Sequence, residues 1–242
     1  LLLLEISVLT LVAIYMSAGS VSREREDRTL DLILTTPITP QMYIWGKLRG
    51  LVSFLSWLLA LPVVTVAMVA IYALLGQWMG WTGATVQHAV PGGTIETTML
   101  FIEAPLLMAI MLIPFTAWCV AIGMSWSVSS KGVLSSLVAT VCVVAGVAVV
   151  LGLCGGWAVR TIPYLGVMIN ALSPATNMLM VINPVDHIDG FIETGSPYAR
   201  GRITLLISAI ISAAIYSLLV YSILAGVIRS FNESVRKLSG QG

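Results

Sequence analysis

A dense cluster of charges between two long apolar runs limits the folds open to this chain. Arg23 to Asp31 holds seven of the chain's 23 Asp, Glu, Lys and Arg residues within nine positions. Residues 1–21 before the cluster and 51–75 after it are almost entirely apolar. A charge at the centre of a bilayer costs roughly 2.5 to 3.5 kcal/mol on insertion scales. We therefore expect the cluster to lie in water at one face of a membrane.

The composition predicts an all-α, polytopic helical membrane protein. Of the 242 residues, 58% are hydrophobic and 10% are charged, whereas about 25% are charged in an average soluble domain. The apolar runs are continuous rather than alternating, which favours spanning helices over a barrel. A net charge of +1 argues against nucleic acid as a partner. We predict a single transmembrane domain over residues 1–242, embedded in the lipid bilayer.

Hydropathy places five spans along the chain, at about 1–21, 51–75, 100–123, 133–154 and 203–228. Between them we predict a cytoplasmic region at 22–49 and an outer-face loop at 155–202. A cytoplasmic tail follows at 229–242. Several prolines interrupt the outer-face loop, so we expect interfacial or re-entrant helices before the last span. The alternative is that 161–183 forms a further span.

The orientation follows from the positions of Lys and Arg. With the charge cluster inside, nine of these residues are cytoplasmic and Arg160, Arg200 and Arg202 are outside, which obeys the positive-inside rule. A span at 161–183 would move the tail outside and give a slightly worse distribution. The first span then enters from outside, so we expect the sequence to begin within a longer protein, with one span before it.

The charge cluster itself has helix signals. Ser22 is a favoured N-cap, and acidic residues follow in the first turn. We predict a helix from Arg23 to Thr35, ended by Pro37. Thr39 and Pro40 begin the next helix, which carries Lys47 and Arg49 before the second span.

The stretch from Glu24 to Lys47 resembles the cytoplasmic signature of the ABC type-2 transporter permeases. That signature has an acidic-basic-acidic triplet, a Leu-rich turn, a Ser/Thr-Pro pair and a Gly-Lys before the next span. The matching residues are Glu24-Arg25-Glu26, Thr29-Leu30, Leu32 to Leu34, Thr36-Pro37, Thr39-Pro40 and Gly46-Lys47. Arg28 stands where the family has glycine. The stretch covers about a tenth of the chain, and the remaining resemblance is architectural.

The resemblance implies a six-span permease subunit of an exporter-type ABC transporter. It implies a coupling helix that docks on a separate nucleotide-binding ATPase subunit, which binds ATP and Mg, and pairing with a second permease as a homo- or heterodimer. It also implies a plasma (inner) membrane of the bacterial type. The coupling residues would be Glu24, Arg25, Glu26, Arg28, Thr29, Leu30, Ile33 and Leu34. The plainer interpretation is that the charges only set topology.

No motif predicts catalysis, a bound cofactor or a metal in this chain. A phosphate-binding loop GxxxxGK[ST] is absent from the sequence. His187 lies between Asp186 and Asp189, but a metal site needs further donors. We interpret Cys119, Cys142 and Cys154 as small buried hydrophobic residues.

Three residues are candidates for lining a translocation route: Glu103, Pro105 and Pro114. Glu5 and Glu103 lie near the outer ends of their runs, where solvation at the interface explains them equally well. Packing kinks are the alternative for the two prolines. Two other classes of function remain open at this point. One is an integral-membrane enzyme that uses Glu103, Asp186, His187 or Asp189, and the other is a membrane anchor without transport.

Overall fold

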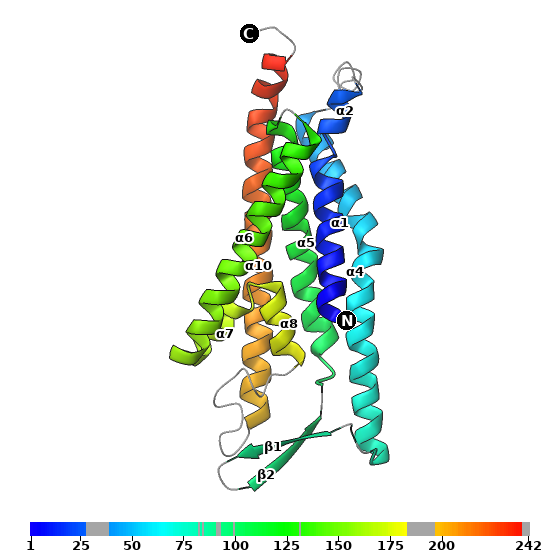
Figure 1. The fold of residues 1–242 in the computed structure, drawn as a ribbon, viewed down its shortest axis with the longest axis vertical. Coiled ribbons are helices and arrows are strands. Elements are labelled where there is room, and N and C mark those ends of the chain that lie inside the picture. The colour runs from blue at the N-terminus through cyan, green and yellow to red at the C-terminus, as the bar shows by residue number, and fades with distance from the viewer. Residues whose placement is uncertain are drawn as a thin grey trace. The chain divides into compact units, whose positions relative to one another are not determined.

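Five long helices dominate the computed structural model, which describes residues 1–27, 39–81, 83, 85–90, 93–98, 100–130, 132–182 and 197–238. They are α1 (Leu2–Ala18), α4 (Pro40–Met79), α5 (Ala104–Ser129), α6 (Val133–Thr161) and α10 (Pro197–Leu238) (Figure 1). All five are long and apolar enough to cross a membrane, α1 together with the residues that follow it as far as Glu24. The chain is a polytopic helical membrane protein, as the composition predicts.

Two of these helices are much longer than a span requires. α4 has 40 residues and α10 has 42, so each is about 60 Å long at about 1.5 Å per residue, twice the thickness of a hydrocarbon core. Thr39 precedes α4, and its hydroxyl accepts a hydrogen bond from the Met42 amide at 3.3 Å. α10 extends beyond the predicted span at both ends. The predicted tail is therefore helical as far as Leu238. At the other end, α10 begins at Pro197, within the range predicted as the outer-face loop.

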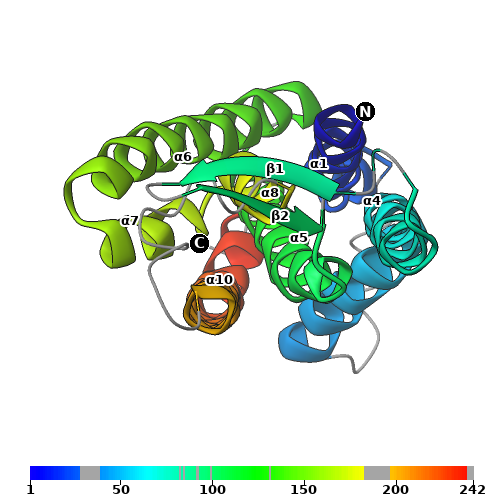
Figure 2. The same cartoon turned by 90° about the horizontal axis from the view of Figure 1, so that it is seen from below.

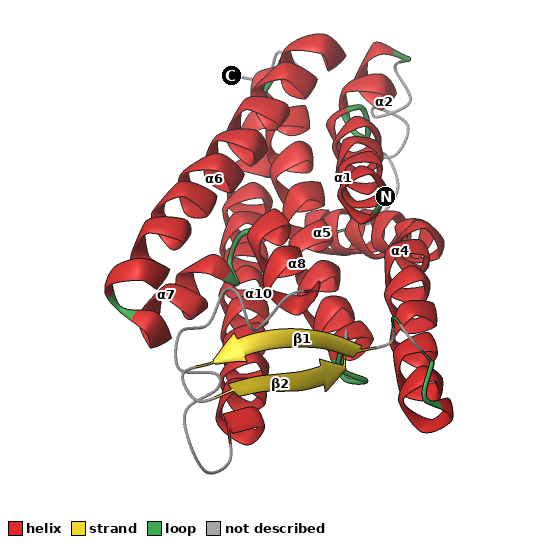
Figure 3. Ribbon diagram, turned by 60° about the horizontal axis from the view of Figure 1, so that its bottom comes forward, coloured by secondary structure: helices red, strands yellow, loops and turns green. Residues whose placement is uncertain are grey.

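A β-hairpin between α4 and α5 was not predicted. Strands β1 (Thr85–Val90) and β2 (Gly93–Thr98) are antiparallel (Figures 2 and 3). Their register pairs Thr85 with Thr98 and Val90 with Gly93. This polar stretch is rich in Thr, Val and Ile, whose branched side chains favour extended backbone. The hairpin is a small addition to an otherwise helical chain.

The described chain divides into two compact units, and the first comprises Leu1–Glu5, Ala60–Leu112 and Ala148–Ala213. It contains two short helices, α7 (Pro163–Asn170) and α8 (Pro174–Ile182), each with proline in its first turn. They replace the single span that 161–183 would form in the alternative topology. α6 also continues seven residues past the predicted end of its span, to Thr161.

Side chains satisfy the backbone where α7 ends and α8 begins. The Ser212 hydroxyl donates to the Ala171 carbonyl at 3.0 Å, and the Thr176 hydroxyl donates to the Asn170 carbonyl at 2.6 Å. A buried carbonyl without a partner costs about 1 to 3 kcal/mol, so these two partners permit a helix break there. Gly166 makes the α6–α7 turn tight, because a Cβ at that position would lie 2.3 Å from the backbone of Val159.

The second unit comprises Ile6–Leu59, Ile113–Val147 and Ala214–Gly242. Its core includes an aromatic cluster of Phe115 and Trp118 on α5 with Tyr216 on α10, whose ring centroids are 5.4 to 5.8 Å apart. α1 and α5 approach each other closely at Gly123, where an added Cβ would lie 2.0 Å from the Ser17 hydroxyl and 3.1 Å from the Ala18 nitrogen. Helix pairs in membranes commonly approach through such small residues.

The prediction for the cysteines is wrong at two of three positions. Cys119 is buried, whereas Cys142 and Cys154 on α6 are exposed. α6 is the least buried of the five helices. Of its apolar stretch of 18 residues 11% is buried, against 67% for the corresponding stretch of α5. An apolar residue on such a helix is therefore more often exposed than packed.

Candidate coupling site

The charge cluster begins on α2 (Ser22–Glu26), and Ser127 near the end of α5 holds the start of this helix in place. The Ser127 hydroxyl accepts hydrogen bonds from the Val21 and Ser22 amides at 3.0 and 2.9 Å. The Ser22 hydroxyl donates to the Ser127 carbonyl at 3.1 Å and lies 3.0 Å from the Ser127 hydroxyl. All of these atoms are buried, so the two serines satisfy each other and the first amides of α2.

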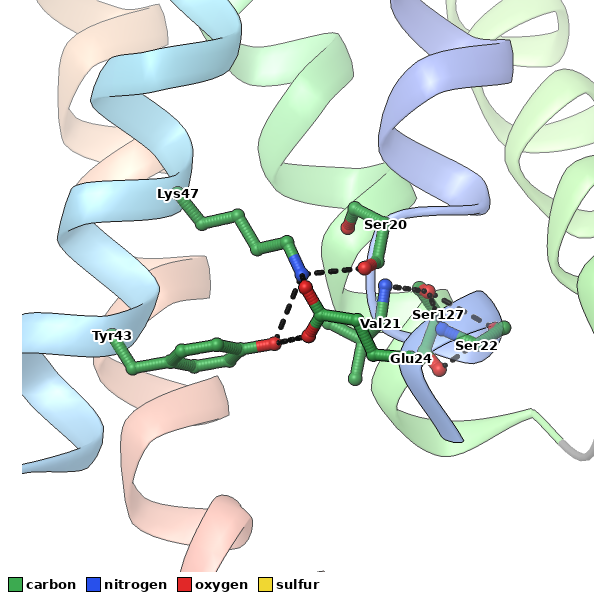
Figure 4. A network of polar contacts seen from close by, with 7 residues as sticks. All are labelled: Ser20, Val21, Ser22, Glu24, Tyr43, Lys47 and Ser127. Atoms are coloured by element: carbon green, nitrogen blue, oxygen red, sulfur yellow. Dashed lines mark hydrogen bonds and ion pairs between the residues drawn. The ribbon is translucent and has the colours of Figure 1, made fainter. Parts of the chain in front are cut away.

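Glu24 connects α2 to the start of α4. Its Oε1 lies 2.6 Å from Lys47 Nζ, and its Oε2 accepts a hydrogen bond from the Tyr43 hydroxyl (Figure 4). Lys47 Nζ also donates to the Tyr43 hydroxyl at 2.9 Å and to the Ser20 carbonyl at 2.5 Å. We call this group, Ser20, Glu24, Tyr43 and Lys47, the Glu24 clasp.

The clasp uses all three hydrogen-bond donors of the Lys47 ammonium. An ammonium has three donors, and those of Lys47 reach a carboxylate, a hydroxyl and a carbonyl. The exposed fractions of the Lys47 and Glu24 side chains are 16% and 29%. Partial burial reduces screening by solvent, so this pair contributes more than an exposed one. Tyr43 and Lys47 are four residues apart and therefore share one face of α4.

Arg23 lies back along α1, away from the clasp. Its Nη2 donates to the Tyr15 hydroxyl at 2.7 Å, and its guanidinium lies 5.1 Å from the centroid of the Tyr15 ring. Gly19 leaves room for this contact, since a Cβ there would lie 3.0 Å from Arg23 Nε. One acidic and one basic residue of the cluster are thus occupied within the protein.

The structure describes only part of the predicted coupling region, and the role of these residues stays a prediction. Glu24 lies in the clasp, and Arg25 and Glu26 lie on α2. The remaining predicted coupling residues fall outside the described residues: Arg28, Thr29, Leu30, Ile33 and Leu34. The predicted N-cap is wrong, because Ser22 is the first residue of α2 and its side chain bonds to Ser127 instead of to its own helix.

Sequence reasoning missed Tyr43, Ser20 and Ser127. The spacing of Tyr43 and Lys47 was a usable signal, because residues four apart on a helix are neighbours. Nothing local points to Ser127, which is 105 residues from Ser22 along the chain. Asp186, His187 and Asp189 fall outside the described residues.

The predicted route residues occupy separate places. Glu103 precedes α5 in the first unit and forms an ion pair with Arg202. Pro105 is the second residue of α5, where its missing N–H breaks no helical bond. Pro114 lies within α5 in the second unit and lines a groove of about 770 Å³ together with Trp45 and Arg49. Their role in transport stays a prediction.

The motif resemblance is now joined by a match over nearly the whole chain. The family model described as ABC-2 family transporter protein matches residues 6–233. This chain belongs to the ABC-2 transporter family. The chain is therefore the permease component of an ABC transporter, a transport component of the membrane and not itself the catalyst.

Proteins of the ABC-2 family generally pair with an ATP-binding subunit. A comparison with curated proteins finds no match, and a comparison with solved structures finds none either. Membership in a transport family argues against the integral-membrane enzyme considered from the sequence.

Proposed function

We propose that this ABC-2 permease exports its substrate with energy from ATP hydrolysed, with Mg, on a separate nucleotide-binding subunit. The Glu24 clasp is the observation that carries the proposal. It joins the last described helix before segment 28–38 to the first helix after it. A force that a docked subunit exerts on that segment would therefore be transmitted to α1 and α4 together.

The Ser22–Ser127 contact supports the same route for force. α2 bonds to α5 through two buried serines and to α4 through a partly buried ion pair. A docking element that is bonded to two helices transmits the motion of a docked subunit to both of them. An element on a flexible loop would move without displacing the helices. Exposed ion pairs between the charge cluster and the ATPase subunit would each stabilise the docked complex by about 0.2 to 1 kcal/mol and fix its register.

The assembly we propose has two permeases and two nucleotide-binding subunits, in a plasma membrane of the bacterial type. Support for a second permease comes from α6, which exposes the small residues Ser135, Cys142 and Gly146, because helices in membranes associate through small residues. Substrate would pass between the permeases. Export is the direction implied by the family resemblance.

The test measures ATP hydrolysis by the complex of permease and ATPase subunits in lipid vesicles and compares it with hydrolysis by the ATPase subunits alone. Transport by the same vesicles is measured in parallel. We expect Arg25→Ala to abolish the stimulation of hydrolysis by the permease, while insertion and co-purification of the second permease remain. Arg229→Ala, which changes an exposed basic residue outside both the clasp and the groove at Pro114, serves as the control. Membrane insertion that fails in Arg25→Ala alone would favour the topology-signal interpretation, and failure to retain any ATPase would favour a membrane anchor.

A further inference from the structure

A largely apolar cavity lies in the first unit, where α5, α8 and α10 meet. Its volume is about 330 Å³, within the range of roughly 300 to 1,000 Å³ typical of ligand sites. Its walls come from all three helices: Ala104, Leu107, Val181, Ile203, Leu205 and Leu206. Leu107, Val181 and Leu205 are buried, whereas Ile203 and Leu206 are 55% and 40% exposed and form its rim.

One ion pair supplies the polar part of this cavity. Glu103 pairs with Arg202, and the Arg202 guanidinium lies 5.6 Å from the centroid of the Phe101 ring. The Arg202 side chain is 43% exposed, and a guanidinium has five donors in a planar fork. The Glu103 side chain is 39% exposed, but its Oε2 is buried and has no hydrogen-bond partner among the described residues. A buried acceptor of this kind is costly until a donor reaches it.

The ion pair lies where two candidate spans begin. The apolar spans start at Ala104 on α5 and at Arg202 on α10. The charged groups therefore stand at the level of lipid headgroups, and Leu107, Leu205 and Leu206 lie farther along the spans, at the level of acyl chains. A ligand that follows this gradient has a polar head and an apolar chain.

We propose that this cavity binds a membrane phospholipid whose headgroup carries a hydrogen-bond donor. An acyl chain fills the apolar part, the phosphate bonds to the Arg202 guanidinium, and the headgroup donor reaches Glu103 Oε2. A guanidinium fits phosphate through two parallel hydrogen bonds, and a hydroxyl or ammonium of the headgroup satisfies the carboxylate. The proposal concerns binding alone and does not rest on the transport function proposed above.

The experiment titrates the purified full-length protein in mild detergent with phosphatidylglycerol labelled on its acyl chain, and follows fluorescence anisotropy. Two further probes carry the same label: phosphatidylcholine, which has the phosphate without a headgroup donor, and diacylglycerol, which has a hydroxyl without the phosphate. We expect phosphatidylglycerol to bind about tenfold more tightly than either, the equivalent of roughly one good polar contact. Equal affinity for all three probes would overturn the proposed headgroup recognition.

Matched substitutions locate the site. Leu206→Trp fills the cavity and should abolish saturable binding, whereas Ile207→Trp, at a neighbouring residue of similar exposure (42%) that does not line the cavity, should not. Arg202→Gln should weaken phosphatidylglycerol about tenfold, while Arg229→Gln at the far end of the same span leaves it unchanged. Ile203→Trp at the rim is the second filling variant, should Leu206→Trp fail to fold. Unchanged affinity in a folded filling variant would overturn the proposal.

Discussion

Lys47 holds three partners from two segments of the chain, and this makes it the most informative residue to change. Lys47→Gln removes the positive charge and leaves the Glu24 carboxylate, 29% exposed, without its cation. We expect the free energy of unfolding to fall by about 1 to 3 kcal/mol, less than the loss for a fully buried pair. Thermal unfolding in detergent measures this effect.

The control for Lys47 lies two residues away on the same helix. Arg49→Gln removes the same charge from an exposed side chain that is not part of the clasp, so we expect a change within about 0.5 kcal/mol. Glu24→Gln combined with Lys47→Gln should be less destabilising than the sum of the single changes, because the pair is lost once. Additive effects would show that the clasp contributes no coupling energy.

Ser127 is the second residue on which the position of α2 depends. Ser127→Ala leaves the buried amides of Val21 and Ser22 without an acceptor, and we expect a loss of about 1 to 3 kcal/mol in stability. Ser129→Ala removes a hydroxyl whose partner among the described residues is the Ser125 carbonyl of its own helix, and it should change stability little. Equal melting temperatures for both variants would contradict the proposed anchor.

Among the helices, the contact between α1 and α5 depends on the absence of a side chain at Gly123. Gly123→Ala would place a carbon 2.0 Å from the Ser17 hydroxyl and 3.1 Å from backbone, so we expect destabilisation by about 1 to 3 kcal/mol. Gly146→Ala on α6 meets nothing within 4 Å and should stabilise its helix by up to about 1 kcal/mol. Opposite shifts in melting temperature are the expected result, and a stabilised Gly123→Ala would contradict the packing.

For α6, the sequence predicts the helix correctly but not the side of the helix that is buried. The small residues Ser135, Ala139, Cys142 and Gly146 have the spacing of a packing stripe, but none of them is buried. Ser136, Thr140 and Val144 form the buried stripe instead. Both stripes have helical spacing and similar residue sizes, so the sequence contains nothing that distinguishes them.

For the whole molecule, the distribution of Lys and Arg predicts the orientation of all five spans. In a variant with Cys142 and Cys154 changed to serine, Gln77→Cys near the end of α4 should react with a membrane-impermeant maleimide in intact cells. Ser129→Cys at the end of α5 should react only after permeabilisation. Both positions are exposed, and the reverse labelling pattern would invert the topology.

The sequence by itself determined the class of protein, the number of spans and the family signature. These properties depend on composition and on patterns within a few residues, such as the cost of charge in hydrocarbon or the preference of threonine and proline for the start of a helix at Thr39 and Pro40. The charge cluster was recognisable in the sequence for the same reason, because its charges lie within nine consecutive positions.

Only the tertiary structure decided which of those residues meet. The partners are Ser22 and Ser127, Glu24 and Lys47, and Glu103 and Arg202. They lie on different helices or, for Glu103, directly before one, and their contacts depend on how those helices rotate and approach. Many pairings of polar residues are compatible with one hydropathy pattern, because hydropathy records only the preference of each side chain for water or hydrocarbon. Close packing at positions such as Gly123 and Gly166 fixes how neighbouring segments approach each other, which no hydropathy pattern records.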